Sequence, residues 1–235
     1  EDFRNTFISH QKVFKRVMDD EEIFLKISPT LFFEILLRKA ANDLGKVSYT
    51  LEKTSTIKIP VFDAKDVVEL LNKEPILVYL AEMLSSFTRI ESYAISFRKG
   101  KGVWRKIRFN DLDIFSLMSF CEVVEYEYRV GFYKRIGDIC LFILGLFPDY
   151  AEHDYRYPFS GQVRPQIPGK IRISPEEYDK KGREFYKLAA EHLSTKEQEL
   201  SEVFWALHVS FQKAKKPLNF IAEHYLHYTR HNLFC

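Results

Sequence analysis

The stretch Arg135-Ile-Gly-Asp-Ile-Cys-Leu-Phe-Ile-Leu-Gly-Leu-Phe-Pro148 decides the fold. Between Asp138 and Pro148 every residue is apolar or glycine, so a helix over this run has no face suited to water. Crossing a bilayer takes about 20 apolar residues, and the run is too short for that. The stretch therefore predicts a central helix that other helices of the same domain enclose, and no contact with a membrane.

The composition is typical of an ordinary globular protein. Of the 235 residues, 46% are hydrophobic and 15% aromatic, which excludes general disorder. The net charge of +2 gives no overall attraction to nucleic acid or lipid, so any such binding has to come from a local patch. The three cysteines lack the Cys-x-x-Cys spacing of a metal site, and two lie in apolar runs. This usage is typical of a reducing compartment, and we expect a cytoplasmic protein.

Apolar residues at three- and four-residue spacing predict about eight helices around the 139–147 segment. Ser28-Pro29, Gly45 and a capping box at Ser174–Glu177 are typical helix boundaries. We also expect Asp63 to cap the helix that runs to residue 71, and Asn110 or Asp111 to cap the helix that runs to residue 129. Gly131 is expected to break or kink the helix before the central segment. The expected ranges are about 5–25, 29–45, 63–71, 75–89, 110–129, the central helix up to Pro148, 175–193, 196–214 and 217–231.

In two segments apolar and polar residues alternate as in strands, and in a third segment hydrophobic residues show no regular spacing. Residues 47–61 alternate apolar and polar side chains, which predicts short strands or extended chain. Residues 92–109 alternate likewise around the glycines of Lys99-Gly-Lys-Gly102, which predicts a β-hairpin. Residues 150–173 are rich in proline and glycine and predict a long irregular loop, a length that is more often functional than incidental. The sequence thus predicts a mainly α fold: one domain over residues 1–235, a multi-helix bundle around a buried central helix, with a minor β-hairpin.

The hairpin is the first candidate site, because basic and aromatic residues interleave there without any acid. Such a hairpin can grip phosphates and stack a base. The nucleic-acid-binding candidates are Arg98, Lys99, Lys101, Trp104, Arg105, Lys106 and Arg108. The alternative, which the sequence alone favours, is a solvated edge hairpin whose lysines prevent aggregation.

A polar stripe on the helix expected over 110–129 is the second candidate site. Ser116, Ser119, Glu122, Glu125 and Arg129 recur at three- and four-residue steps and would share one face. Glu125 and Arg129 also have the favoured order for an i,i+4 ion pair. A plain solvent face is the favoured interpretation; if the face lines a cleft, Glu122 or Asp138 is suited to act as a general base. The candidate catalytic residues are Glu122, Glu125, Arg129, Asp138 and His153, the last at the start of the long loop.

Three histidines near the C-terminus are the third candidate site. On a helix, His224, His227 and His231 would lie within one third of the circumference, on one face. Three imidazoles on one face are suitable ligands for zinc. Histidines that interact with the dipole of a helix C-terminus are the favoured alternative, so no metal is expected. The sequence also lacks phosphate-binding glycine loops, nucleophile elbows and His-Glu-x-x-His, and we expect no cofactor.

Two stretches carry a resemblance to a family. Over Arg135–Asp138 with Gly145–Pro148, and over Leu80–Glu91, the chain resembles uncharacterised prokaryotic helical proteins, with residues from about 25 to 160 covered. The resemblance implies a helical fold and no particular activity. Our leading hypothesis is a cytoplasmic interaction or ligand-binding protein; the alternatives are an enzyme with an acid/base site on the 122–138 polar face, and a nucleic-acid-binding protein that uses the hairpin 97–109. The apolar end with Phe234 and Cys235, together with an exposed hairpin edge, is compatible with a homodimer.

Overall fold

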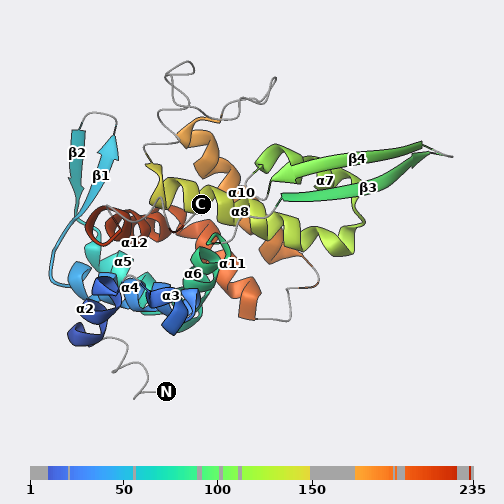
Figure 1. The fold of residues 1–235 in the computed structure, drawn as a ribbon. Helices are drawn as coiled ribbons and strands as arrows, with labels where there is room; N and C mark the ends of the chain where they lie inside the picture. The colour runs from blue at the N-terminus through green and yellow to red at the C-terminus, as the bar shows by residue number, and fades with distance from the viewer. Residues whose placement is uncertain are drawn as a thin grey trace.

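The computed structural model is mainly helical, as predicted. It describes residues 10–20, 22–54, 57–88, 92–100, 103–110, 113–148, 173–192, 194, 199–226 and 233, with the backbone only at 53, 54, 57, 92–100 and 103–110. Within these ranges there are ten α-helices, against the eight or so expected, one 3-10 helix and two hairpins (Figure 1). The helices are α2 (Gln11–Asp19), α3 (Ile23–Lys26), α4 (Pro29–Leu44), α5 (Ala64–Leu71), α6 (Glu74–Ser86), α7 (Ile114–Val123), η1 (Tyr126–Tyr128), α8 (Arg129–Leu146), α10 (Pro175–Glu191), α11 (Glu199–Val209) and α12 (Phe211–His224).

Helix α8 is the buried central helix that the sequence predicts. Every residue from Ile136 to Leu146 is buried, and α8 packs chiefly against α10 and α12. The side-chain amide of Asn219 on α12 donates to the carbonyl oxygens of Leu144 and Gly145, at 2.9 and 2.6 Å, and so satisfies carbonyls at the end of α8 that have no partner within the helix. The long apolar run is therefore a packing element with a capped end.

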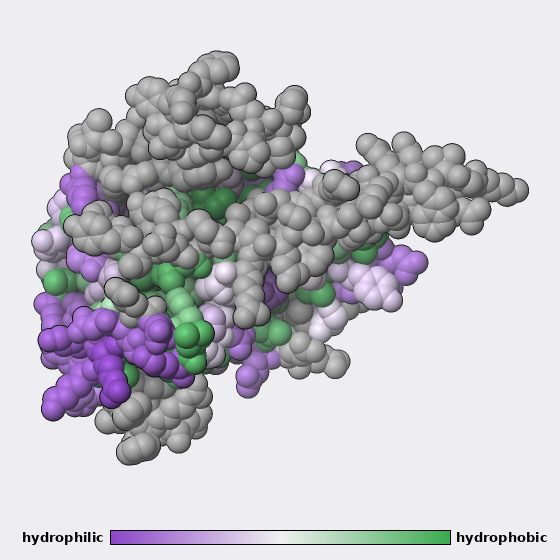
Figure 2. Space-filling model, in the orientation of Figure 1, coloured by the Kyte–Doolittle hydropathy of each residue, from purple (hydrophilic) through white to green (hydrophobic). Residues whose placement is uncertain are grey.

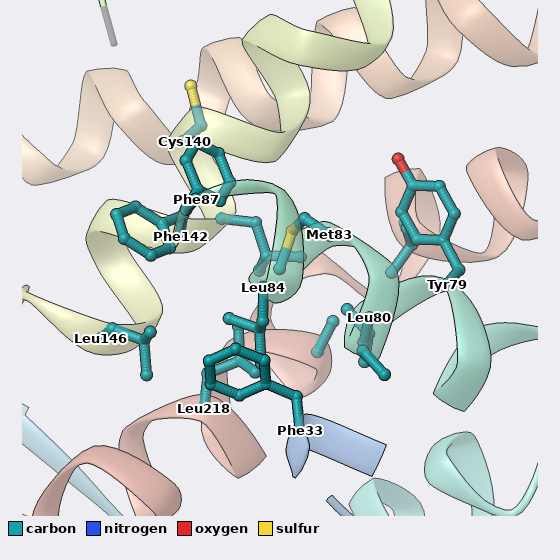
Figure 3. Packing of buried hydrophobic residues seen from close by; sticks show 14 of the residues in the cluster. Phe33, Tyr79, Leu80, Met83, Leu84, Phe87, Cys140, Phe142, Leu146 and Leu218 are labelled. Atoms are coloured by element: carbon teal, nitrogen blue, oxygen red, sulfur yellow. The ribbon is translucent and has the colours of Figure 1, made fainter. Parts of the chain in front are cut away.

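The buried faces of α4, α6, α8, α10 and α12 meet in one hydrophobic cluster (Figure 3). Phe87, just after α6, stacks on Phe142 of α8 with ring centroids 4.1 Å apart. The predicted boundaries hold for two of these helices: Ser28 caps α4 through the Leu31 amide, and Ser174 and Glu177 form the capping box of α10.

Both segments with strand periodicity form antiparallel hairpins. Strands β1 (Thr50–Thr54) and β2 (Ile57–Val61) pair near α12, and β3 (Ser92–Gly100) pairs with β4 (Val103–Asn110). The β3–β4 hairpin extends away from the helices as an arm (Figure 1), and neither strand has extensive contact with a helix in the described part of the chain. The expected loop at 150–173 falls almost wholly outside the described residues.

The expected helix over 5–25 is wrong in its extent. The described part has α2 and α3 separated at Asp20, whose carboxylate accepts hydrogen bonds from the Glu22 amide and from Lys26 Nζ. This local bonding competes with the helical backbone, which is why an aspartate inside a periodic run can end a helix.

Asp63 is the N-cap residue of α5, as predicted, but without the expected side-chain bond, and two other expected boundaries are wrong. Asp63 precedes α5 but makes no capping bond, because its carboxylate instead accepts from Thr50 Oγ1 at 2.5 Å and from Lys216 Nζ. The residue at the cap of α7 is Asp113, not Asn110 or Asp111. Pro217 lies inside α12 instead of starting a helix, because the apolar stripe from Phe211 onward continues through it into the core.

Candidate functional sites

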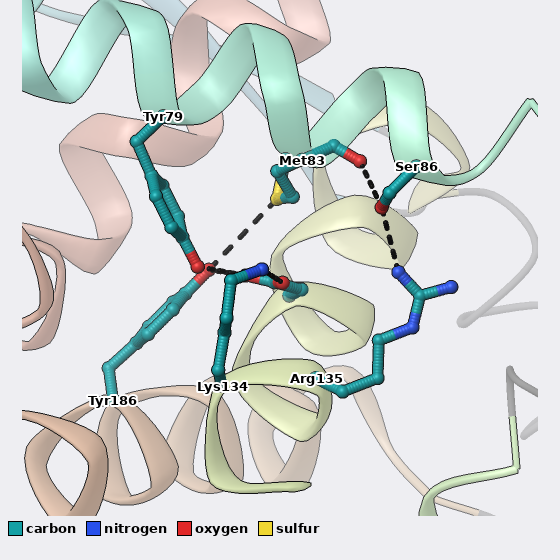
Figure 4. Close-up of polar contacts among 7 residues, drawn as sticks. Tyr79, Met83, Ser86, Lys134, Arg135 and Tyr186 are labelled. Atoms are coloured by element: carbon teal, nitrogen blue, oxygen red, sulfur yellow. Dashed lines mark hydrogen bonds and ion pairs between the residues drawn. The ribbon is translucent and has the colours of Figure 1, made fainter. Parts of the chain in front are cut away.

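The most enclosed polar group of the described residues is the carboxylate of Asp138, in the middle of α8. Tyr79 Oη donates to Asp138 Oδ1 at 2.6 Å, and Tyr186 Oη donates to the same oxygen at 2.9 Å. Lys134, one turn earlier on α8, donates to Oδ2 at 2.7 Å. Figure 4 shows the two phenols, from α6 and α10, pointing at the same place on α8. The carboxylate thus joins three helices that are far apart in sequence.

The sequence around Asp138 makes room for these partners. A Cβ at Gly137 would stand 2.9 Å from the ring of Tyr186, so only a glycine lets that ring lie flat against α8. Tyr186 in turn stacks on Phe204, and Tyr79 meets Phe204 edge-on. Aromatic carbon therefore surrounds the polar atoms on the side away from Lys134.

The groups around Asp138 are two neutral phenols and one ammonium, and all three donate hydrogen bonds to its carboxylate. Burial raises the pKa of Tyr79 and of Tyr186 well above the ordinary value, and the negative charge of Asp138 adds to the effect, so both phenols remain neutral donors. The ammonium of Lys134 is 5.1 Å from the ring centroid of Tyr79, and its side chain is 39% exposed while that of Asp138 is fully buried. Lys134 is thus the one member of the cluster that reaches water.

Chemically this cluster is a structural tie between α6, α8 and α10. Both oxygens of Asp138 accept hydrogen bonds from donors of the protein itself, Oδ1 from the two phenols and Oδ2 from Lys134. Two shallow hollows on the described surface lie elsewhere: one over α2 and α3, where charged residues gather (Figure 2), and one beside Trp205 on α11. A second polar link runs next to the tie, where Arg135 lies over the Phe87 ring at 3.9 Å and donates to Ser86 Oγ at 2.8 Å.

The polar stripe does not lie on one helix, contrary to the prediction. Helix α7 ends at Val123, Glu125 is extended, and α8 begins only at Arg129, so Glu125 and Arg129 do not have the geometry of an i,i+4 pair. Arg129 Nε instead donates to the carbonyl oxygen of Val124 at 2.9 Å, which stabilises this elbow. The expected break at Gly131 is thus displaced to 124–128, and Gly131 is helical.

The structure therefore separates the catalytic candidates. Glu122 and Glu125 are exposed, Arg129 is half-buried at the elbow, and Asp138 is more than two turns further along α8 in the core. His153 lies outside the described residues.

Of the histidine trio, the structure describes His224 alone. His224 is the last residue of α12, where its ring stacks on Phe220 and its Nδ1 hydrogen-bonds to the Phe220 carbonyl at 3.0 Å. His227 and His231 lie outside the described residues. No group of three or more His, Cys, Asp or Glu side chains in the described ranges is arranged to hold a metal ion.

Sequence reasoning missed a histidine at the turn after α10. His192 is buried, its Nε2 is 2.8 Å from the carbonyl oxygen of Tyr126, and its Nδ1 is 2.7 Å from Ser194 Oγ. Because a carbonyl oxygen only accepts, Nε2 carries the proton and Nδ1 accepts from Ser194. This pairing joins the α7–α8 elbow to the α10–α11 turn, and no local pattern in the sequence indicates it.

The β3–β4 arm is the second candidate site, and its register is regular from Ser92↔Asn110 to Arg98↔Trp104. Alternate positions of a strand belong to opposite faces, and directly paired residues belong to the same face. One face therefore contains positions 94, 96, 98, 104, 106 and 108, and the other contains 93, 95, 97, 105, 107 and 109. The first face holds Arg98, Lys106 and Arg108; Lys99 falls at a register shift, and Lys101 lies outside the described residues.

No family model matches the chain, and no curated protein or solved structure is significantly similar to it. Among the described residues, no helix combines the length and apolar character needed to cross a membrane.

Proposed function

We propose that this protein is an interaction protein that binds nucleic acid through the β3–β4 arm. The observation that carries the proposal is a separation of charge. Residues 92–110 contain six basic residues and no acidic one, whereas the rest of the chain contains 29 basic and 33 acidic residues. A basic arm on a body of net negative charge directs a polyanion to the arm and away from the helices.

The placement of the arm supports the same proposal. The hairpin extends from the helical body, so a long polymer can contact it without meeting the acidic surface (Figure 1). Basic residues that only protect a strand edge from aggregation need not be six in number, nor be confined to one hairpin. By contrast, nucleic-acid binding depends on the number of cations that contact phosphates together.

Fluorescence anisotropy with a labelled 30-nucleotide DNA, single-stranded or as a duplex, tests the proposal. If all six cations contact phosphates of a duplex, the slope of log K against log salt is about −5.4, and affinity falls about 2,000-fold between 50 and 200 mM salt. Replacing Arg98, Lys106 and Arg108 by alanine should halve that slope. The matched control replaces the exposed Lys12, Lys15 and Arg16 of α2 by alanine, an equal loss of charge at a distance from the arm, and should retain the parental slope.

Two results would overturn this proposal. One is a parent protein without salt-dependent binding to either DNA. The other is an equal loss of affinity in the α2 control, which would make the attraction a property of the overall charge.

We further propose that the protein works in the cytoplasm of a prokaryotic cell, where the arm has access to nucleic acid. Cys121 and Cys140 are free thiols, and Cys140 is fully buried, which suits a reducing compartment. The homodimer stays a hypothesis, and light scattering on the purified protein across micromolar concentrations tests it.

A further inference from the structure

Resting on the proposed function, we infer that the ligand of the arm is double-stranded DNA, and that the basic face of the hairpin lies along its major groove. The basic face is the set of positions 94, 96, 98, 104, 106 and 108. The inference follows from the register of the arm, its dimensions and the distribution of its aromatic residues.

The register favours a duplex over a single strand as the ligand of the arm. A single-strand site combines cations with aromatic platforms, so that phosphates and bases of the same strand are held together. Here the pairing puts Tyr93, Phe97 and Phe109 at positions of one face, whereas Arg98, Lys106 and Arg108 occupy positions of the other. Only Trp104 is an aromatic residue of the basic face. Arg105 pairs with Phe97 on the aromatic face, so each face holds one residue of the other kind. Most stacking groups are nonetheless at positions of one face and most assigned cations at positions of the other, and a base-paired ligand needs only the cations.

The spacing of the cations fits the regular backbone of a duplex. Arg108 pairs with Ala94, Lys106 with Ser96, and Arg98 with Trp104, so each of three successive rungs on the basic face has one cation. Such rungs are two residues, or about 6.6 Å, apart. Phosphates of one strand of a duplex follow at about 3.4 Å along the axis, so the cations match every second phosphate.

The dimensions of the hairpin select the major groove of B-form DNA. A strand of nine residues, the length of β3, extends about 30 Å, which is nearly one helical turn of about 34 Å. The major groove is about 12 Å wide and admits a two-stranded ribbon, whereas the minor groove is about 6 Å wide. The major groove of A-form RNA is too deep and narrow for such an element. The proposed complex therefore has the arm inserted in the DNA major groove over less than one helical turn.

The test compares three 30-nucleotide probes of one sequence: duplex DNA, its single strand, and the duplex RNA. We expect duplex DNA to bind at least about tenfold more tightly than the other two at 100 mM salt, a ratio that anisotropy titrations resolve easily. A second comparison uses two triple variants with equal loss of charge, R98A/K106A/R108A on the basic face and K99A/K101A/R105A outside it. The first should lower the salt slope by about 3, and the second should lower it by less. Far-UV circular dichroism and the urea midpoint verify that both variants keep the fold.

Groove blocking identifies the contact surface. A duplex whose cytosines carry glucosylated hydroxymethyl groups, which fill the major groove, should lose binding, whereas netropsin in the minor groove should leave it unchanged. Tighter binding of the single strand, equal effects of the two triple variants, or insensitivity to the glucosyl groups would overturn this inference while the proposed function stands. Absence of salt-dependent binding to all three probes would instead overturn the proposed function.

Discussion

Replacing Tyr186 by phenylalanine removes one hydrogen bond from the buried carboxylate of Asp138 and leaves the packing of the ring almost unchanged. The bond from Tyr186 Oη to Asp138 Oδ1 is 2.9 Å long and has no access to water. A hydrogen bond to a charged group contributes about 1.5–3 kcal/mol, so we expect a loss of about 2 kcal/mol in the free energy of unfolding. With a urea m-value of about 2.5 kcal/mol/M, the midpoint should fall by about 0.8 M at pH 7.

The same change at Tyr79 should cost a similar amount, because its bond to the same oxygen is 2.6 Å long. The double variant Y79F/Y186F leaves Lys134 as the remaining donor of the three to a fully buried carboxylate. We therefore expect the double variant to lose more than the sum of the single losses, with a coupling of about 0.5–3 kcal/mol. The matched control is Tyr128→Phe, because that side chain is 68% exposed, and its midpoint should stay within about 0.5 kcal/mol of the parent. If Y186F and Y79F behave like Y128F, the interpretation of the cluster as a tie between three helices is wrong.

Three further predictions concern the described core and surface. Gly137→Ala should cost about 1–3 kcal/mol in thermal or urea unfolding, because the new Cβ would meet an aromatic ring at 2.9 Å, whereas Gly131→Ala in the same helix has open space and should gain up to about 1 kcal/mol. Burial raises the pKa of Asp43, but hydrogen bonds from lysine and tyrosine donors outweigh it and hold the pKa below its ordinary value. The stability that Asp43 contributes is therefore present above about pH 4 and lost as the pH falls through the lowered pKa, so Asp43→Asn should show a smaller fall of the urea midpoint between about pH 5 and pH 2 than the parent. Burial raises the pKa of the Cys121 thiol to about 11 and that of Cys140 further still, so at pH 8 Ellman's reagent should label Cys121 slowly in the native protein and Cys140 only after unfolding.

The parts of the fold that the sequence predicts are those with a local cause. The apolar run after Asp138 predicts the buried part of α8, and Ser174 with Glu177 predicts the start of α10, because both depend on neighbours within one or two turns. The strand periods predict the β3–β4 hairpin and the extended conformation of residues 47–61 for the same reason, whereas the pairing of β1 with β2 is not part of the prediction. Where the local rule competes with a distant contact, the prediction holds only in part: Asp63 is at the N-cap of α5, but its carboxylate accepts from Lys216 across the fold instead of from the first turn of the helix.

The cluster around Asp138 was only partly accessible to sequence reasoning. Lys134 and Asp138 have the spacing of an i,i+4 pair on a helix, and this pattern is visible in the sequence. Tyr79 and Tyr186 come from 59 residues before Asp138 and 48 residues after it, and only tertiary packing brings them together. A tyrosine in an apolar stretch requires a partner for its hydroxyl group, so each tyrosine predicts some polar contact but not its identity.

The Asp138 cluster and the β3–β4 arm differ in whether their polar groups already have partners within the protein. A binding site needs charges that water can reach and that a ligand can neutralise, because a charge already paired inside the protein has little left to offer. Asp138 is fully buried, and its oxygens accept three hydrogen bonds from the protein. These bonds stabilise the packing of α6, α8 and α10, and they leave the carboxylate unavailable to a ligand. The arm has the opposite character: its cations have no acidic residue among them in sequence, and within the described ranges its strands have no extensive contact with a helix. If the arm binds nucleic acid as proposed, substitutions on the basic face should change affinity without changing the unfolding of the core.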